Sequence, residues 1–260
     1  MRLDKKNKLK NKLKNNELTI GSWLTIPSQQ IVEVMSTTEL DWIVIDLEHA
    51  PINIESVVNL VGHIQGNNMS ALVRVGSHDE LIIKRVLDAG ADGIIVPMVK
   101  NKNQTHDIIN KVKYPPDGLR GVGLNRAHRY GYGFKDYLEI QKDLIIIVQI
   151  EHIESVNNLE DIISVEGIDG ILVGPYDLSA SMGHPGDYNR KDVVDTIKEI
   201  EDITKKSNKS LGFHVIETNH EEVLKKINSN YNFIAFSMDF LFFGNYMRQE
   251  FNNLKKKLNE

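Results

Sequence analysis

The stretch Ile145-Ile146-Ile147-Val148-Gln149-Ile150-Glu151 is an apolar run of strand length that ends on an acid. A second run, Ile171-Leu172-Val173-Gly174-Pro175-Tyr176-Asp177, also leads into an acid within a few residues. Continuous β-branched runs are typical of strands buried on both faces of a parallel sheet. An acid at such a strand end meets water, a cation or a substrate, or it caps the following helix. The pair, Glu151 and Asp177, therefore suggests a metal site with oxygen ligands.

Short β-branched runs of this kind recur from residue 20 onward, and longer segments of helical period separate most of them. The predicted strands are 20–26, 42–47, 70–75, 92–97, 144–150, 169–173, 210–216 and 232–237. This number of β/α units in about 250 residues favours a single closed (β/α)8 TIM barrel over a doubly wound open sheet. No Gly-x-Gly-x-x-Gly turn follows the first strand, although dinucleotide-binding open sheets usually have one.

The composition is ordinary for a soluble globular protein, with 41% hydrophobic and 26% charged residues. Cysteine is absent, which excludes disulfides, zinc–thiolate sites, iron–sulfur clusters and a cysteine nucleophile. No apolar stretch approaches the ~20 residues that a membrane span needs, and none of signal-peptide length follows the basic start. We therefore expect a cytoplasmic protein that neither enters nor binds a membrane.

The amino-terminal segment is strongly basic, because residues 1–14 hold seven of the 31 Lys and Arg residues and one of the 36 acids. It has no interleaved aromatic residues, and the rest of the chain is acidic, so we expect no nucleic-acid binding. We predict that residues 1–16 form a basic helix or arm that is frayed and solvated. Residues 17–260 are predicted to form the barrel as one domain.

Polar residues occupy the ends of the second and third predicted strands, where TIM barrels gather their chemistry. Asp46 and Glu48 end the second strand on the same side, and His49 follows in the loop. Arg74 stands in the third strand, where an aliphatic residue would be expected. A buried arginine needs an anionic partner, which here is either a substrate or a neighbouring acid.

The fifth and sixth strand ends supply further candidates. The period of two places Gln149 and Glu151 on one face of the fifth strand. After the sixth strand, Gly174 and Pro175 form a tight turn that exposes backbone amides beside Asp177, and such amides suit a small carboxylate.

Together these motifs resemble the HpcH/HpaI aldolase family, the metal-dependent class II pyruvate aldolases. The resemblance runs in order from about residue 18 to about residue 240. Its motifs are Asp46-x-Glu48-His49-Ala50-Pro51, Arg74, Val96-Pro97-Met98-Val99, Tyr114-Pro115-Pro116-x-Gly118-x-Arg120-Gly121-Val122-Gly123, Val148-Gln149-Ile150-Glu151 and Gly174-Pro175-x-Asp177-Leu178-Ser179. It implies a barrel of the phosphoenolpyruvate/pyruvate type that reversibly cleaves a 4-hydroxy-2-oxo acid or a 2-keto-3-deoxy sugar acid to pyruvate and an aldehyde.

The resemblance also implies catalytic roles. Glu151 and Asp177 would ligate a divalent cation, Mg²⁺ or Mn²⁺, with Co²⁺ as a substitute, because these ions accept all-oxygen ligation. Arg74 would stabilise the enolate oxygen, and His49 would act as general base on the 4-hydroxyl. Asp46 belongs to the same motif as His49, and we therefore expect it to be a catalytic residue as well.

The resemblance further implies an oligomer. Asp88 matches a family aspartate that acts on the histidine of a neighbouring subunit, although it is equally compatible with an ordinary helix end. Family members are commonly hexamers built from two trimers that exchange their last helix. The apolar run Phe240-Leu241-Phe242-Phe243 is consistent with that exchange. We therefore expect a homo-oligomer, either a hexamer or a trimer.

The substrate site follows from the same resemblance. Arg74, Gln149 and the segment Gly174-Pro175-Tyr176-Asp177 would bind the 2-oxo acid. Tyr176 stands where the family usually has a small alanine, which leaves the identity of the aldehyde open. His214 ends the seventh strand and could face the mouth, but a hydrogen-bonded structural role is favoured.

Three alternatives stay open on the sequence. Lys100, after the fourth strand, could be the nucleophile of a Schiff-base aldolase if it is desolvated. A thioester lyase of the citrate lyase type would share the barrel and its acidic pair, but no clear segment for gripping coenzyme A is evident. The third alternative is a barrel that binds an oxo acid without turnover.

Overall fold

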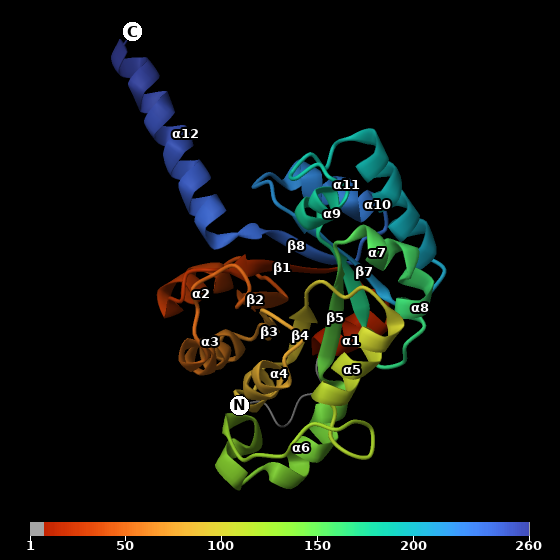
Figure 1. Ribbon diagram of the computed structural model, residues 1–260. Coiled ribbons are helices and arrows are strands. Elements are labelled where there is room, and N and C mark those ends of the chain that lie inside the picture. Colours follow the sequence, from red (N-terminus) through yellow and green to blue (C-terminus); the bar gives the residue numbers. More distant parts are fainter. Residues whose placement is uncertain (1–7, 260) are drawn as a thin grey trace.

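The computed structural model describes residues 8–259 and folds them around a closed barrel of parallel strands, in which neighbours follow chain order and β8 pairs with β1 (Figure 1). The strands are β1 (Thr19–Leu24), β2 (Trp42–Asp46), β3 (Ser70–Arg74), β4 (Gly93–Val96), β5 (Ile145–Ile150), β6 (Gly170–Val173), β7 (Ser210–Val215) and β8 (Phe233–Met238). The predicted (β/α)8 barrel is therefore confirmed, and the doubly wound open sheet is excluded.

Helices surround the barrel and connect its strands (Figure 1). They are α1 (Lys8–Lys14), α2 (Gln29–Ser36), α3 (Ile54–Gly66), α4 (Glu80–Asp88), α5 (Lys102–Val112), α6 (Phe134–Ile140), α7 (Ile153–Asn157), α8 (Leu159–Ile163), α9 (Pro175–Ser181), α10 (Lys191–Thr204), α11 (His220–Asn228) and α12 (Asp239–Asn259), with short 3-10 turns at Arg126–Gly131 and Gln141–Asp143. No helix within residues 8–259 has the length and apolar character needed to cross a membrane.

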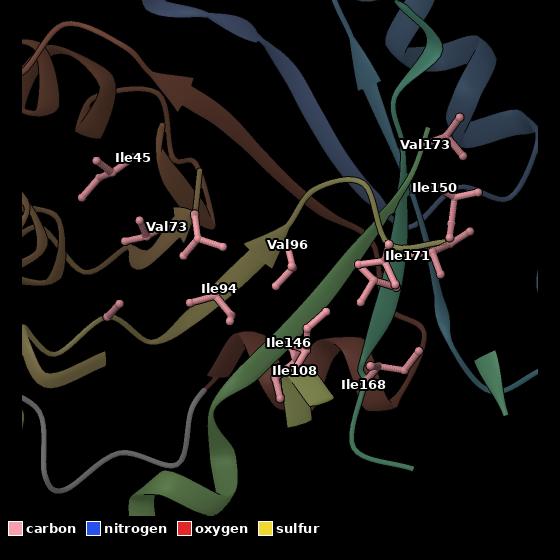
Figure 2. Close-up of a cluster of buried hydrophobic side chains, with 14 of the residues drawn as sticks. Ile45, Val73, Ile94, Val96, Ile108, Ile146, Ile150, Ile168, Ile171 and Val173 are labelled. Atoms are coloured by element: carbon pink, nitrogen blue, oxygen red, sulfur yellow. The ribbon is translucent and has the colours of Figure 1, made fainter. Parts of the chain in front are cut away.

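The core has two shells, because successive strand residues point alternately into the barrel and out toward the helices. Outward residues such as Ile45, Val73 and Ile146 pack with the helices in one cluster, part of which Figure 2 shows. A Cβ on Gly21 would lie 2.0 Å from the ring of Trp42, so a glycine in β1 makes room for an indole inside the barrel. The inward cluster comprises Trp23, Trp42, Val44, Leu72, Ile95, Ile145, Ile147, Leu172, Phe233 and Ala235, together with two α1 leucines.

Helix α1 closes the amino-terminal end of the barrel. Leu9 and Leu13, one helical turn apart, are 2% and 1% exposed and join the inward cluster. The Lys10 ammonium lies 2.8 Å from the Asp169 carboxylate and donates to the Leu144 carbonyl at 2.7 Å. The prediction of a solvated helix was therefore wrong for residues 8–14, because the open end of the barrel buries their apolar face. Residues 1–7 of the predicted arm lie outside the described residues.

Helix α12 extends away from the barrel (Figure 1). It is anchored by Asp239, which accepts hydrogen bonds at 2.8 Å from the backbone amides of Thr25 and Ile26. Phe242 packs against Phe236 of β8 with ring centroids 5.0 Å apart, and most of the other apolar side chains of the helix are exposed. The exposed apolar residues are Phe240, Phe242, Phe243, Tyr246, Met247, Phe251, Leu254 and Leu258.

Candidate active site

The carboxyl ends of the strands place polar side chains above the apolar interior. Asp46 and Arg74 end the adjacent strands β2 and β3 and are paired in register. Gln149 lies in β5, and Glu151 follows that strand directly. Asp177 lies in the first turn of α9, after β6. These are the strand ends at which TIM barrels carry their active sites, so the predicted positions converge on one face.

Arg74 is held by two acids of its own chain. Its Nε and Nη2 atoms donate to the two carboxylate oxygens of Asp46 at 2.9 and 2.8 Å, and its Nη1 atom lies 3.2 Å from Glu48 Oε2. Burial alone would raise the pKa of Asp46, but the Arg74 guanidinium and backbone hydrogen bonds hold that pKa below its usual range. The salt bridge allowed by the sequence is therefore present, and it fixes the orientation of the guanidinium plane.

Glu151 is a buried carboxylate, 2% exposed, at the centre of this face. Its Oε1 atom accepts from the Met98 amide at 2.7 Å, and its Oε2 atom accepts from Gln149 Nε2 at 2.7 Å. Burial raises the pKa of Glu151 to about 8, and the nearby charges of Glu48 and Asp177 act in the same direction. A carboxylate in this environment is ionised at neutral pH most readily when a cation lies beside it.

The backbone around Glu151 is shaped to fit it. Met98 has a positive φ of 54°, a conformation that few non-glycine residues adopt, and its amide points at the carboxylate. A Cβ on Gly174 would lie 2.6 Å from Glu151 Oε2, so only glycine leaves room there. The glycine of the turn predicted at residues 174–175 therefore leaves space for the Glu151 carboxylate at the end of the neighbouring strand.

The donor set fits a hard divalent cation. Residues 8–259 contain no cluster of three or more His, Cys, Asp or Glu side chains that could hold a metal ion. Two carboxylates are nevertheless sufficient for Mg²⁺ when water or substrate oxygens complete the coordination. The charge of Asp177 contributes to the raised pKa of Glu151. Gln149 Oε1 is also buried without a hydrogen-bond partner among the described residues.

His49 and Tyr176 line the open rim of this face. The His49 side chain is 64% exposed, and its Nε2 atom lies 3.8 Å from Glu48 Oε2. Tyr176 is 47% exposed and packs against Tyr188 with ring centroids 5.4 Å apart. Both side chains are therefore accessible to a ligand that approaches the buried carboxylate from solvent.

Asp88 lies at the other end of the barrel. It is the last residue of α4 and precedes the start of β4, so it is remote from the strand ends that carry His49. Its Oδ1 atom lies 2.6 Å from Arg120 Nη2. Arg120 is 1% exposed, and its Nη1 atom donates to the Tyr137 hydroxyl at 3.1 Å. A single chain thus brings the other predicted site residues to one face and leaves Asp88 apart from them.

Lys100 does not meet the requirement for a Schiff-base nucleophile in this structure. Its side chain is 29% exposed, and its ammonium lies 3.8 Å from the Glu154 carboxylate. A nucleophilic lysine needs desolvation or a neighbouring cation to lose its proton at neutral pH.

Trp23 is a site residue that the sequence analysis missed. Its indole lies beneath Arg74, with 4.3 Å between the guanidinium carbon and the ring centroid. It also contacts His214, whose ring centroid is 5.2 Å away. The alternation of side chains in β1 could have identified Trp23, because it lies two residues after Gly21 and therefore on the same, inward face of the strand. The Nε2 atom of His214 is buried without a hydrogen-bond partner among the described residues, so the hydrogen-bonded structural role of His214 stays a prediction.

Comparison with known proteins agrees with this geometry. The model of the HpcH/HpaI aldolase/citrate lyase family matches residues 19–243. The hydroxypyruvate/pyruvate aldolase of Roseovarius nubinhibens is 36% identical over 196 residues, which cover 74% of this chain and 76% of that protein. The 5-keto-4-deoxy-D-glucarate aldolase of Escherichia coli O157:H7 is 36% identical over 195 residues, which cover 75% of this chain and 76% of that protein.

A solved structure gives the same result. The crystal structure of an HpcH/HpaI aldolase/citrate lyase family protein from Burkholderia cenocepacia superposes with a TM-score of 0.91 at 29% identity, covering 96% of this chain and 99% of the other. Barrel closure, strand-end residues and sequence identity over three quarters of the length agree with the resemblance drawn from the motifs. The chain belongs to the HpcH/HpaI aldolase/citrate lyase family.

Proposed function

We propose that this protein is a metal-dependent pyruvate aldolase that reversibly cleaves a 4-hydroxy-2-oxo acid, or a 2-keto-3-deoxy sugar acid, to pyruvate and an aldehyde. The observation that carries this proposal is the buried carboxylate of Glu151, at the same end of the barrel as Arg74 and Asp177, whose charges both act on its pKa. Both curated relatives described above are named as aldolases, which supports the same reaction class.

Glu151 and Asp177 are the proposed ligands of Mg²⁺ or Mn²⁺, with Co²⁺ as a substitute. A cation at this place would supply Lewis acidity toward the keto oxygen of the substrate. Gln149 and the backbone of residues 174–177 orient the 2-oxo acid. The guanidinium of Arg74, held in place by Asp46, stabilises negative charge on the enolate oxygen.

His49 is the proposed general base. In the cleavage direction it takes the proton from the 4-hydroxyl, the C3–C4 bond breaks, and its electron pair passes into the enolate of pyruvate while the aldehyde leaves. Protonation of C3 then completes pyruvate. An imidazole suits this step because its ordinary pKa of ~6.5 allows proton exchange at neutral pH.

The proposed active form is a homo-oligomer, a trimer or a hexamer. The exposed apolar face of α12 fits an exchange of this helix between subunits. Asp88, which lies away from His49 of its own chain, would reach a neighbouring subunit's histidine in such an assembly. The proposed substrates are small molecules, and the absence of cysteine suits the reducing cytoplasm.

The test is a pyruvate-coupled screen of 4-hydroxy-2-oxo acids on the full chain, with and without Mn²⁺. We expect turnover that EDTA abolishes and Mn²⁺ restores, and no adduct on borohydride treatment with pyruvate. His49→Ala should lose at least 100-fold in kcat while keeping pyruvate affinity. Turnover that survives EDTA, or a trapped lysine adduct, would refute the metal mechanism. Pyruvate binding with no turnover of any substrate would favour the non-catalytic alternative.

A further inference from the structure

One backbone peptide links the loop after β3 to the buried carboxylate of Glu151. It is the peptide between Pro97 and Met98, which follows the end of β4. Its N–H belongs to Met98 and donates to Glu151 Oε1 at 2.7 Å. Its carbonyl belongs to Pro97 and lies 2.6 Å from Nε2 of His78. Both ends of one peptide group are therefore held by side chains, and none of the roles proposed above uses His78.

The contact between His78 and Pro97 is a hydrogen bond of known direction. A carbonyl oxygen can only accept, so Nε2 of His78 carries a proton and donates it. The loop that carries His78 begins beside β4, because the amide of its first residue, Val75, donates to the Ile95 carbonyl. Nζ of Lys111 in α5 donates to the carbonyl of His78 at 2.8 Å, which fixes its backbone as well.

Met98 adopts a backbone conformation that needs support. Its φ is 54°, in the left-handed region that is unfavourable for any residue with a Cβ. Such a conformation persists only where the surrounding structure over-determines it. Rotation of the peptide plane between Pro97 and Met98 would return φ to negative values and would turn the amide away from Glu151. The two hydrogen bonds of this peptide oppose the rotation, and His78 makes the one at the carbonyl end.

The Met98 amide takes part in orienting the Glu151 carboxylate. It binds Oε1, while Nε2 of Gln149 binds Oε2 at 2.7 Å, so each carboxylate oxygen has a donor that fixes its direction. A hydrogen bond to the carbonyl of a peptide polarises the group and strengthens the bond that its N–H donates. Partners of this kind orient metal ligands and tune the affinity of the site.

We propose that His78 is a positioning residue of the metal site, and that it acts through the peptide between Pro97 and Met98 to fix the orientation of the Glu151 carboxylate for cation binding. The inference rests on the proposed function, in which Glu151 is a metal ligand. It also joins two parts of the site, because Arg74 ends β3 and His78 lies in the loop that follows the same strand.

The test measures Mn²⁺ binding to the full chain by calorimetry, without substrate. His78→Leu removes the donor. Loss of a group that orients a metal ligand costs roughly 10–100-fold in affinity, so we expect Mn²⁺ to bind about tenfold more weakly to this variant. His78→Gln keeps an N–H donor and should bind Mn²⁺ within about threefold of the wild type. His78→Ser, whose side chain is too short to reach the carbonyl, replaces a His78→Leu protein that does not fold.

The matched control is His63→Leu. Nε2 of His63 lies 3.1 Å from Glu33 Oε1, so this variant also removes an imidazole contact. His63 belongs to the last turn of α3, which leads back to the amino-terminal end of the barrel, and its loss should leave Mn²⁺ affinity unchanged. Urea unfolding of each variant separates folding from positioning. A merely structural His78 would change the free energy of unfolding and leave the affinity for Mn²⁺ as it is.

The outcomes separate this proposal from the metal proposal. If the wild type binds Mn²⁺ and His78→Leu binds it as tightly, or if His78→Gln loses as much affinity as His78→Leu, the positioning role is refuted while the metal site stands. If the wild type binds no Mn²⁺, the metal proposal fails, and crystal structures of the wild type and His78→Leu decide the positioning role. A peptide that rotates and loses its contact with Glu151 supports that role, and an unchanged peptide overturns it.

Discussion

Replacing Asp46 with asparagine tests whether the ion pair between Asp46 and Arg74 stabilises the fold and orients the Arg74 guanidinium. Asp46 supplies two of the three carboxylate contacts to the guanidinium, at 2.9 and 2.8 Å, whereas Glu48 supplies one at 3.2 Å. The Arg74 side chain is 11% exposed, so little solvent is available to replace the lost partner. Asp46→Asn should therefore leave a buried cation incompletely paired.

The magnitude follows from this geometry. Removing one partner of a buried ion pair costs about 3–5 kcal/mol. Because Glu48 remains beside the guanidinium, we expect the lower end of that range, about 3 kcal/mol, in the free energy of unfolding. The change should also lower kcat, because Arg74 loses the contacts that orient it toward the enolate oxygen.

The assay is urea unfolding of the metal-free protein, followed by circular dichroism at pH 7 and at one protein concentration, because association with other subunits adds to apparent stability. A double-mutant cycle with Arg74→Met gives the coupling energy, which we expect to be about 2 kcal/mol, with the double variant more stable than the sum of the single effects predicts. An Asp46→Asn protein that unfolds within about 0.5 kcal/mol of the wild type would refute the reasoning.

Further measurements test other parts of the structure. The pKa of Asp46 is lowered in the folded state, so the stability that Asp46 contributes is present above its usual pKa of 3.8 and is lost as the pH falls below that value. The difference in unfolding free energy between wild type and Asp46→Asn should therefore shrink in acid. Leu13→Ala should destabilise the protein by about 2–4 kcal/mol, whereas the exposed Lys14→Ala should not, and equal losses would contradict the role of α1. Phe243→Asp should reduce the molar mass in light scattering, and an unchanged assembly would contradict the exchange of α12. Glu151→Gln should weaken calorimetric Mn²⁺ binding at least tenfold, and retained affinity would place the metal elsewhere.

The interpretation of the sequence was strongest where one segment carries its own signal. Apolar runs gave all eight strands to within two residues, because a strand buried on both faces must be apolar along its whole length. The polar residues Gln149 and Glu151 were recognisable because they interrupt or end such a run. Trp23 was missed for the opposite reason, since an aromatic residue in an inward position looks like any other part of the core.

The sequence alone thus determined the order of strands and helices, the polar residues at the strand ends and the family, because periodicity and motifs are local properties of the chain. Only the tertiary structure decided that Arg74 pairs with Asp46, that the Met98 amide binds Glu151 and that Lys10 reaches Asp169. These contacts join residues that lie far apart in the chain, and they form only when the barrel closes and its register brings distant strand ends together.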